Sequence, residues 1–284
     1  MNVTKEISVL LDVLNISEKD LGEELDVSLL SINNWRNDNK QIEDININNL
    51  YNFAYSKGIK FNQIFEQLLK EENNTNDSLA LFHGAKKNFS FPIDIKSYSK
   101  DSNDFGKGFY LGESYKQASM YIANSNNNKV YAFKLDTRNL NILKFDVDND
   151  WMLAISYFRG WLDEYKESKI IKNIIHKINE ADVIIAPIAD NRMFDIINEF
   201  SEGSITDKQC EHSLAATDLG YQYVVKTKKA LDNLIYLREL FISTKEKDNL
   251  INQRFDLTST GLNKVKVARI EYKGKGKYIE ELLK

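Results

Sequence analysis

The chain has 284 residues, of which 42% are hydrophobic, enough to bury the core of one large domain or two smaller ones. Its formal charge of −4 argues against a protein that coats nucleic acid or an acidic membrane through its overall field. The single cysteine, Cys210, excludes an internal disulfide and a zinc site built from cysteines. With no apolar run of membrane-spanning length and no signal-peptide pattern at the start, we expect a cytoplasmic protein that does not bind a membrane.

Residues 1–70 are expected to form an all-helical domain. Apolar residues recur every three or four positions in EISVLLDVL, NINNLYNFAYSKG and FNQIFEQLLKE, as they do on the buried face of a helix. The polar stretch EENNTNDS, residues 71–78, predicts a linker to whatever follows.

The stretch DLGEELDVSLLSINNWRND, residues 20–38, carries a more specific pattern for two short helices joined by a turn. We expect five apolar residues to pack these helices and one serine to cap the second: Leu21, Leu25, Val27, Ile32, Trp35 and Ser28. The pattern resembles the phage-repressor (Xre-like) helix-turn-helix, although Gly22 replaces its usual alanine and Asp38 stands near its usual turn glycine.

In that family the second helix enters the major groove of DNA. The resemblance places base-reading positions at Leu29, Leu30, Asn33 and Asn34, and asparagine can bind adenine through two hydrogen bonds. Yet residues 1–70 hold seven Lys or Arg against eleven Asp or Glu, whereas DNA affinity depends on cations. Two alternatives stay open: DNA contact through Asn33 and Asn34, or self-association and docking of a partner protein, which the charge favours.

Beyond the linker, residues 79–245 have the mixture of strand-like and helix-like segments that is typical of an α+β domain. Strands are expected at 79–83, 129–135, 182–188 and 221–227, with helices at 113–124, 149–179, 191–200 and 206–216. The tail, residues 246–284, predicts one strand, a glycine-lysine turn and a short helix. Residues 245–284 hold ten Lys or Arg against six Asp or Glu, so this tail either packs on the second domain as a solvated edge or offers a basic surface to an anionic partner.

The stretch DFGKGFYLGESYKQASMYI, residues 104–122, has glycines where a tight turn is expected to lead into a helix. It resembles the GKGIYFA segment of the diphtheria-toxin-like ADP-ribosyltransferases and the poly(ADP-ribose) polymerases. The resemblance implies that Tyr110 and Tyr121 stack on the nicotinamide ring of NAD. It also implies that Gly106 and Gly108 let the turn close beside the dinucleotide.

Two further motifs match the same superfamily. In LFHG, His83 would bond the ribose of NAD and the Gly84 backbone would pair with the carboxamide. In YQYVVKT, Gln222 stands where a catalytic glutamate is usual. Its amide can still hold a ribose hydroxyl but brings no net charge to the cationic transition state, so the resemblance implies transfer of one ADP-ribose rather than chain elongation.

LFHG, DFGKGFYL, DVIIAPIADNRMFDIINEFSEGSIT and YQYVVKTKKALDNL together are similar to the bacterial and phage family called domain of unknown function 3990, over residues 79 to about 240. In that family glutamine is the expected residue at position 222. Three other residues are weaker candidates: Arg159 could bind a phosphate of NAD, Asp190 either lines the site or caps a helix, and Asp104 braces the glycine turn. We expect no metal.

The resemblances together imply an ADP-ribosyltransferase-like domain behind a helix-turn-helix module. We expect a cytoplasmic mono-ADP-ribosyltransferase that uses NAD as substrate and modifies an unidentified macromolecular acceptor. It would resemble a toxin with an antitoxin partner, or an effector of phage conflict, and repressor-like modules often form homo-oligomers. The alternatives are an NAD glycohydrolase, and a non-catalytic NAD-sensing regulator that binds DNA or a partner through residues 1–70.

Overall fold

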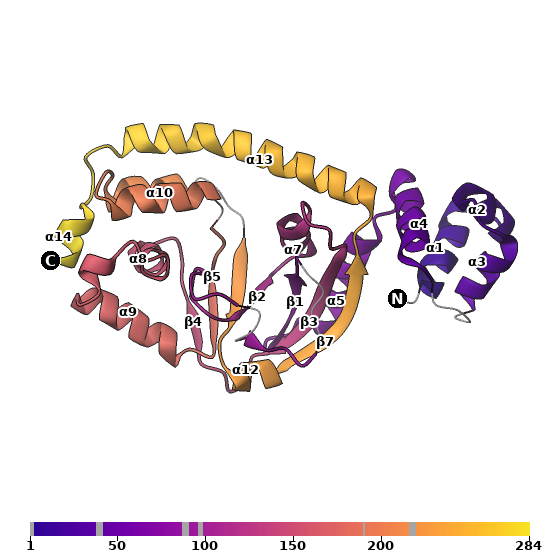
Figure 1. Cartoon of the computed structure of the whole chain (residues 1–284), viewed down its shortest axis with the longest axis horizontal. Helices are drawn as coiled ribbons and strands as arrows, with labels where there is room; N and C mark the ends of the chain where they lie inside the picture. Colours follow the sequence, from indigo (N-terminus) through magenta and orange to yellow (C-terminus); the bar gives the residue numbers. More distant parts are fainter. Residues whose placement is uncertain (1–2, 38–41, 87–90, 96–98, 190, 216–219) are drawn as a thin grey trace.

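A computed structural model gives the protein's architecture, a helical N-terminal region followed by a mixed α/β region (Figure 1). It describes the whole chain except residues 1–2, 38–41, 87–90, 96–98, 190 and 216–219. Among the residues it describes, no helix is both long enough and apolar enough to cross a bilayer.

The N-terminal region consists of helices packed around one apolar core, as predicted. They are α1 (Thr4–Leu14), α2 (Glu18–Leu25), α3 (Leu29–Arg36), α4 (Asp44–Ser56) and α5 (Phe61–Asn73). The expected residues Leu21, Leu25, Ile32 and Trp35 are buried in this core, and Val27 packs half-buried against it. Ser28 caps α3, because its Oγ accepts a hydrogen bond from the Ser31 amide at 3.1 Å.

A seven-stranded mixed sheet follows, in the order β4-β5-β6-β2-β1-β3-β7. The strands are β1 (Ser78–Gly84), β2 (Phe109–Gly112), β3 (Lys129–Asp136), β4 (Ile142–Lys144), β5 (Val183–Pro187), β6 (Tyr221–Val225) and β7 (Leu234–Phe241). All neighbours are antiparallel except β4 and β5. The four predicted strands are confirmed as β1, β3, β5 and β6, whereas β2, β4 and β7 were not predicted.

The sheet is nearly divided between β1 and β2. A single residue pair, Phe82 with Gly112, joins these two strands, while β1 pairs with β3 over its whole length and β2 pairs with β6 over all four of its residues. Two half-sheets, β4-β5-β6-β2 and β1-β3-β7, therefore meet at one pair.

Helices cover one face of both half-sheets. They are α7 (Tyr115–Ile122), α8 (Asn149–Phe158), α9 (Lys169–Glu180), α10 (Asn191–Ser201) and α11 (Asp207–Ala215). The opposite face carries the short α12 (Lys228–Asp232) and a cluster around Phe109 and Phe133. The helical stretch predicted over 149–179 is interrupted: Gly160, with φ of +77°, ends α8, and the short η1 (Asp163–Tyr165) precedes α9.

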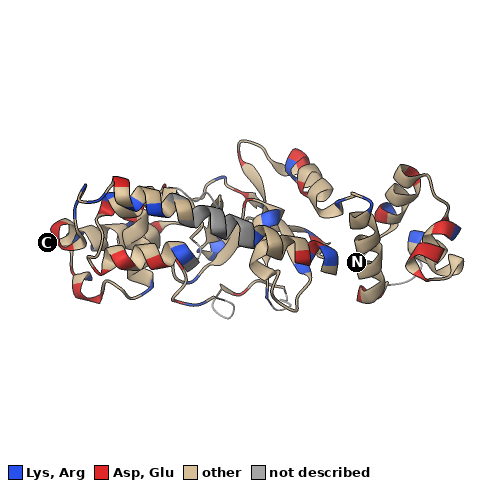
Figure 2. Ribbon diagram, turned by 90° about the horizontal axis from the view of Figure 1, so that it is seen from above, with Lys and Arg blue, Asp and Glu red and all other residues tan. Residues whose placement is uncertain are grey.

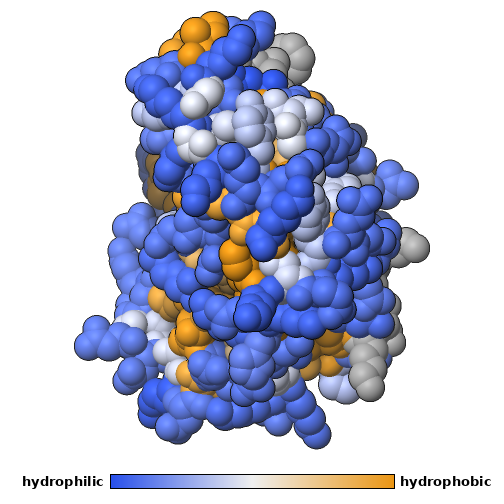
Figure 3. All heavy atoms as spheres, turned by 90° about the vertical axis from the view of Figure 1, so that its left-hand side faces the viewer, coloured by the Kyte–Doolittle hydropathy of each residue, from blue (hydrophilic) through white to orange (hydrophobic). Residues whose placement is uncertain are grey.

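The tail was predicted to contain a strand, and this is wrong. Residues 244–271 form the long helix α13 (Thr244–Glu271), and α14 (Ile279–Leu283) follows. The alternating sequence KVKVARI favours a strand, but Val265 and Ala268, three residues apart, are buried, while Val267 and Ile270 point to solvent. The end of the molecule that carries α9 and α14 has a mostly hydrophilic surface (Figure 3).

The linker predicted at 71–78 is shorter than expected. Helix α5 continues to Asn73 and β1 begins at Ser78, and the turn between them closes through a hydrogen bond from the Thr75 amide to the Ser78 carbonyl. The N-terminal helices consequently pack directly on the second region, with Phe241 of β7 buried in their core.

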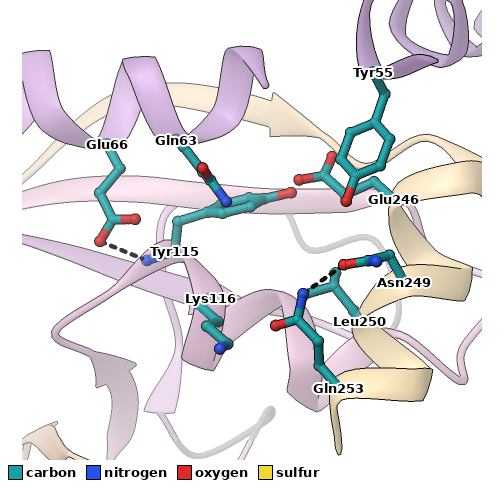
Figure 4. A pocket seen from close by; sticks show the side chains of 9 residues that line it. All are labelled: Tyr55, Gln63, Glu66, Tyr115, Lys116, Glu246, Asn249, Leu250 and Gln253. Carbon is teal, nitrogen blue, oxygen red and sulfur yellow. Dashed lines mark hydrogen bonds between the residues drawn. The ribbon is translucent and has the colours of Figure 1, made fainter. Parts of the chain in front are cut away.

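A buried polar cluster joins four elements, α5, α7, β7 and α13, at this junction. The Asn62 amide group of α5 lies 2.8 Å from the Tyr115 hydroxyl of α7, 2.8 Å from Glu246 Oε2 of α13, and 2.7 Å from the Phe241 carbonyl. A pocket of about 300 Å³ opens beside it, into which the Tyr115 hydroxyl and the Glu246 carboxylate point (Figure 4). Burial raises the pKa of Glu246 from an ordinary 4.5 to about 7.

Replacing Glu246 should therefore change how stability depends on pH. A carboxyl group with a raised folded-state pKa does not lower stability below pH 4.5, and it destabilises the fold progressively as the pH rises to about 7. We expect Glu246→Gln to remove this loss, which amounts to about 3 kcal/mol for a shift of this size. Urea unfolding at pH 5, 6, 7 and 8 measures it, with the exposed Glu271→Gln as control; parallel stability curves for wild type and Glu246→Gln would contradict the assignment.

Candidate functional site

Three motif residues that are far apart in sequence come from three neighbouring strands. His83 is on β1, Tyr110 on β2 and Gln222 on β6, and these strands are adjacent in the sheet. Gln222 pairs with Gly112 and therefore shares a face of the sheet with Tyr110. His83 projects to the other face, where its ring lies 4.3 Å from that of Phe109.

His83 connects the two half-sheets just where their pairing ends. Its Nδ1 lies 2.7 Å from the Tyr110 carbonyl oxygen. A carbonyl only accepts hydrogen bonds, so Nδ1 carries the proton and Nε2 of the neutral ring is an acceptor. Burial lowers the pKa of His83 from 6.5 to about 4, so the ring is neutral at physiological pH.

Tyr110 holds the glycine turn. Its hydroxyl donates to the Gly106 carbonyl at 2.7 Å and accepts from the Phe105 amide at 3.1 Å, and burial raises its pKa. The ring packs against the core formed with α8, α9 and α10. Tyr110 thus lies at the predicted turn, with its hydroxyl bound to protein atoms.

The three motif glycines are required by close packing. A Cβ on Gly108 would lie 2.4 Å from Val224 Cγ1, and one on Gly84 would lie 2.1 Å from the Ala118 carbonyl of α7. Gly106 adopts a φ of +69°, and a side chain there would meet the Phe158 ring at 2.8 Å. The glycines let the turn approach β6 and α8 and let α7 approach β1, whereas the pairing of Gly84 with a carboxamide stays a prediction.

Gln222 belongs to a buried polar chain. Its Nε2 donates to the Asp104 Oδ2 at 3.0 Å and to the Pro187 carbonyl at 3.1 Å. The other Asp104 oxygen accepts a hydrogen bond from Arg159 at 2.7 Å, and the guanidinium carbon of Arg159 lies 3.9 Å from the centre of the Phe194 ring. The structure thus brings Arg159 into the site, but pairs it with a carboxylate rather than leaving it directed at a phosphate.

Sequence reasoning assigned Asp104 only a role in bracing the turn, and it overlooked Lys226. Lys226 Nζ donates to the Phe105 carbonyl at 2.5 Å, and burial lowers its pKa from 10.5 to about 8. Asp104 stands directly before FGKG and Lys226 directly after the QYVV strand. Proximity to two motifs was the only sequence signal that could have identified them.

Two predicted residues are not part of this cluster. Tyr121 is 60% exposed on α7, where Lys86 Nζ lies 4.6 Å from the centre of its ring, and it makes no ring contact with Tyr110. Its role as the second stacking ring stays a prediction. Asp190 lies outside the described residues.

Two hollows of the described structure are lined by none of the predicted NAD residues. The junction pocket of Figure 4 is lined by α4, α5, α7 and α13, and a groove of about 390 Å³ lies between α1 and α5. Within the described ranges, no three His, Cys, Asp or Glu side chains converge as ligands for a metal ion would.

The comparisons with known proteins give one match. Neither the search of curated proteins nor the search of solved structures finds a significant match to the chain. The sequence model of one family matches residues 79–236, more than half of the chain and nearly the whole sheet, from β1 into β7. The chain therefore belongs to the family described as protein of unknown function (DUF3990).

Proposed function

We propose that the chain is an NAD-dependent mono-ADP-ribosyltransferase, related in fold to the diphtheria-toxin-like transferases and poly(ADP-ribose) polymerases. The observation that carries this proposal is the adjacency of His83, Tyr110 and Gln222 on β1, β2 and β6, around the place where the sheet divides. Residues 83, 110 and 222 are separated by long stretches of chain, so their adjacency is a property of the fold.

In this proposal NAD lies along the division between the half-sheets. His83 binds a ribose hydroxyl from one face of this division, and Gln222 Oε1 meets the ribose from the other face as its bond to nicotinamide breaks. The bonding electron pair leaves with nicotinamide, which departs neutral, and positive charge develops on the ribose. A nucleophile of the macromolecular acceptor then bonds the anomeric carbon and releases its proton to solvent.

We propose that the N-terminal helices are an Xre-like helix-turn-helix that contacts protein rather than DNA. Glu18 accepts from Asn33 at 3.0 Å and from Arg36 at 2.6 Å, so a predicted base-reading side chain and the cation beside it are both held by one carboxylate. Leu29 and Leu30 are 50% and 69% exposed on the same helix. Figure 2 shows acidic and basic residues interspersed on these helices, which does not suit the phosphate backbone.

The setting we propose is that of a toxin or an effector of phage conflict, restrained by an antitoxin that binds these helices or the sheet. This setting is supported by the family resemblance alone.

We expect purified protein to transfer label from NAD that is labelled on the adenine-side phosphate to a macromolecule of a cell lysate. His83→Ala should lower this transfer about 100-fold, because the ribose loses a positioned hydrogen-bond acceptor. Protease and nuclease treatment then identifies the acceptor polymer. The control is His176→Ala, which alters an exposed histidine on α9.

Each of the other possible results leads to a different conclusion. Release of nicotinamide without retained label would make the protein an NAD glycohydrolase. Binding of NAD without turnover would favour the non-catalytic regulator. The proposal fails if NAD neither turns over nor raises the melting temperature, or if His83→Ala behaves as His176→Ala does.

The pH profile of nicotinamide release should reflect the low pKa of His83. The neutral ring is needed as an acceptor, so we expect a constant rate from pH 6 to 8 and a fall only toward pH 4. The same lowered pKa means that the stabilisation of the neutral ring is complete above pH 6.5 and is lost as the pH falls toward 4. Circular dichroism at each pH separates unfolding from titration; a rate that halves near pH 6.5 in folded protein would contradict this assignment.

We expect wild-type protein to bind duplex DNA only weakly at 50 mM salt, measured by fluorescence anisotropy with mixed-sequence duplexes. Glu18→Gln should strengthen this binding several-fold, because it releases Arg36 and Asn33 from their shared carboxylate. Glu24→Gln removes the same charge from an exposed site without releasing them and serves as the control. Tight wild-type binding with a steep salt dependence would instead establish a DNA-reading module.

A further inference from the structure

The orientation of the Gln222 side chain is fixed by its partners. The amide NH2 has two hydrogens, and it meets two acceptors, Asp104 Oδ2 at 3.0 Å and the Pro187 carbonyl at 3.1 Å. Turning the amide over would place its oxygen against both acceptors. Oε1 must therefore point away from them, and within the described part of the chain it accepts no hydrogen bond from protein.

Asp104 is in turn held in place by two partners. The residue is 9% exposed and Gln222 is 8% exposed. One carboxylate oxygen accepts from Gln222 and the other from Arg159 at 2.7 Å, and Arg159 itself lies against the Phe194 ring. Each oxygen of Asp104 thus already accepts a hydrogen bond from a protein donor.

We propose that Asp104 is a positioning residue for the transferase chemistry, fixing Gln222 so that Oε1 presents an acceptor to a substrate hydroxyl. This inference rests on the proposed function. The hydrogen bond from the amide to a carboxylate also shifts electron density toward Oε1, because linked hydrogen bonds polarise one another. Asp104 thereby supplies, through the amide, part of the negative charge that a glutamate at position 222 would bring.

Placing a glutamate at position 222 should lower activity unless Asp104 is changed as well. Gln222→Glu alone would set two carboxylates about 3.0 Å apart, beside the Pro187 carbonyl, with no donor between them. In the double variant Asp104→Asn with Gln222→Glu, the new asparagine amide can donate to the new carboxylate while its oxygen still accepts from Arg159. Only the repulsion from the Pro187 carbonyl would remain.

The test compares these variants by the steady-state kinetics of nicotinamide release from NAD. We expect Asp104→Asn to lower kcat about 10- to 100-fold with KM changed less than about threefold, because the lost contribution acts on the transition state. Gln222→Glu should lose at least as much, and the double variant should recover about tenfold over it. Asp101→Asn is the matched control: Asp101 is an exposed acid three residues earlier, paired with Lys107 at 3.5 Å, and its removal should change nothing.

A second measurement does not depend on turnover. The side-chain amide signal of Gln222, identified in the ¹⁵N spectrum by its loss in Gln222→Leu, should exchange slowly with solvent in wild type and quickly in Asp104→Asn. Unchanged exchange overturns the positioning role whether or not NAD is turned over. If the wild type turns over NAD and Asp104→Asn has the same kinetics as Asp101→Asn, the inference fails while the proposed function stands. If the wild type does not turn over NAD, the proposed function fails, and the amide exchange alone decides whether Asp104 positions Gln222.

Discussion

The arrangement of the sheet depends on one backbone pair, Phe82 with Gly112. If β1 and β2 paired along their whole length, Gly84 rather than His83 would lie opposite Tyr110 and its carbonyl. Because the pairing stops, the His83 ring reaches across to that carbonyl and closes the opening with a side chain. The glycines on each side of this division allow α7 and the turn at 104–108 to pack within van der Waals distance of the strands.

Elements with strong local patterns could be predicted from sequence. The strands that became β1, β3, β5 and β6 are apolar runs with clear boundaries, and Ser28 was identifiable as a cap from its place before an apolar helix. Very short strands, and elements whose local sequence pattern favours another structure, could not be predicted. Strand β2 lies inside a glycine-rich stretch, β4 has only three residues, and the KVKVARI segment alternates like a strand although its tertiary contacts hold it in a helix.

The sequence could indicate candidate residues for the site but not how they are connected, and their roles toward NAD stay predictions. Motif spacing identified His83, Tyr110 and Gln222, yet it could not show that strand alternation sends His83 and Tyr110 to opposite faces. Asp104 and Gln222 are 118 residues apart, and nothing in the sequence indicates their hydrogen bond. Arg159 was a weaker candidate for binding a phosphate of NAD, and its pairing with Asp104 is again a property of tertiary structure alone.

Helix α13 connects the N-terminal helices to the helices α10 and α11 of the second region. Asn48 and Asn52 of α4 bond the first turn of α13, and near its other end Arg269 pairs with Glu199 of α10 while its carbonyl accepts from Gln209 of α11. A helix of 28 residues is a stiff rod of about 42 Å. A displacement of α4 is therefore transmitted along α13 to α10 and α11, and α11 is the last helix before β6 and Gln222 in the chain.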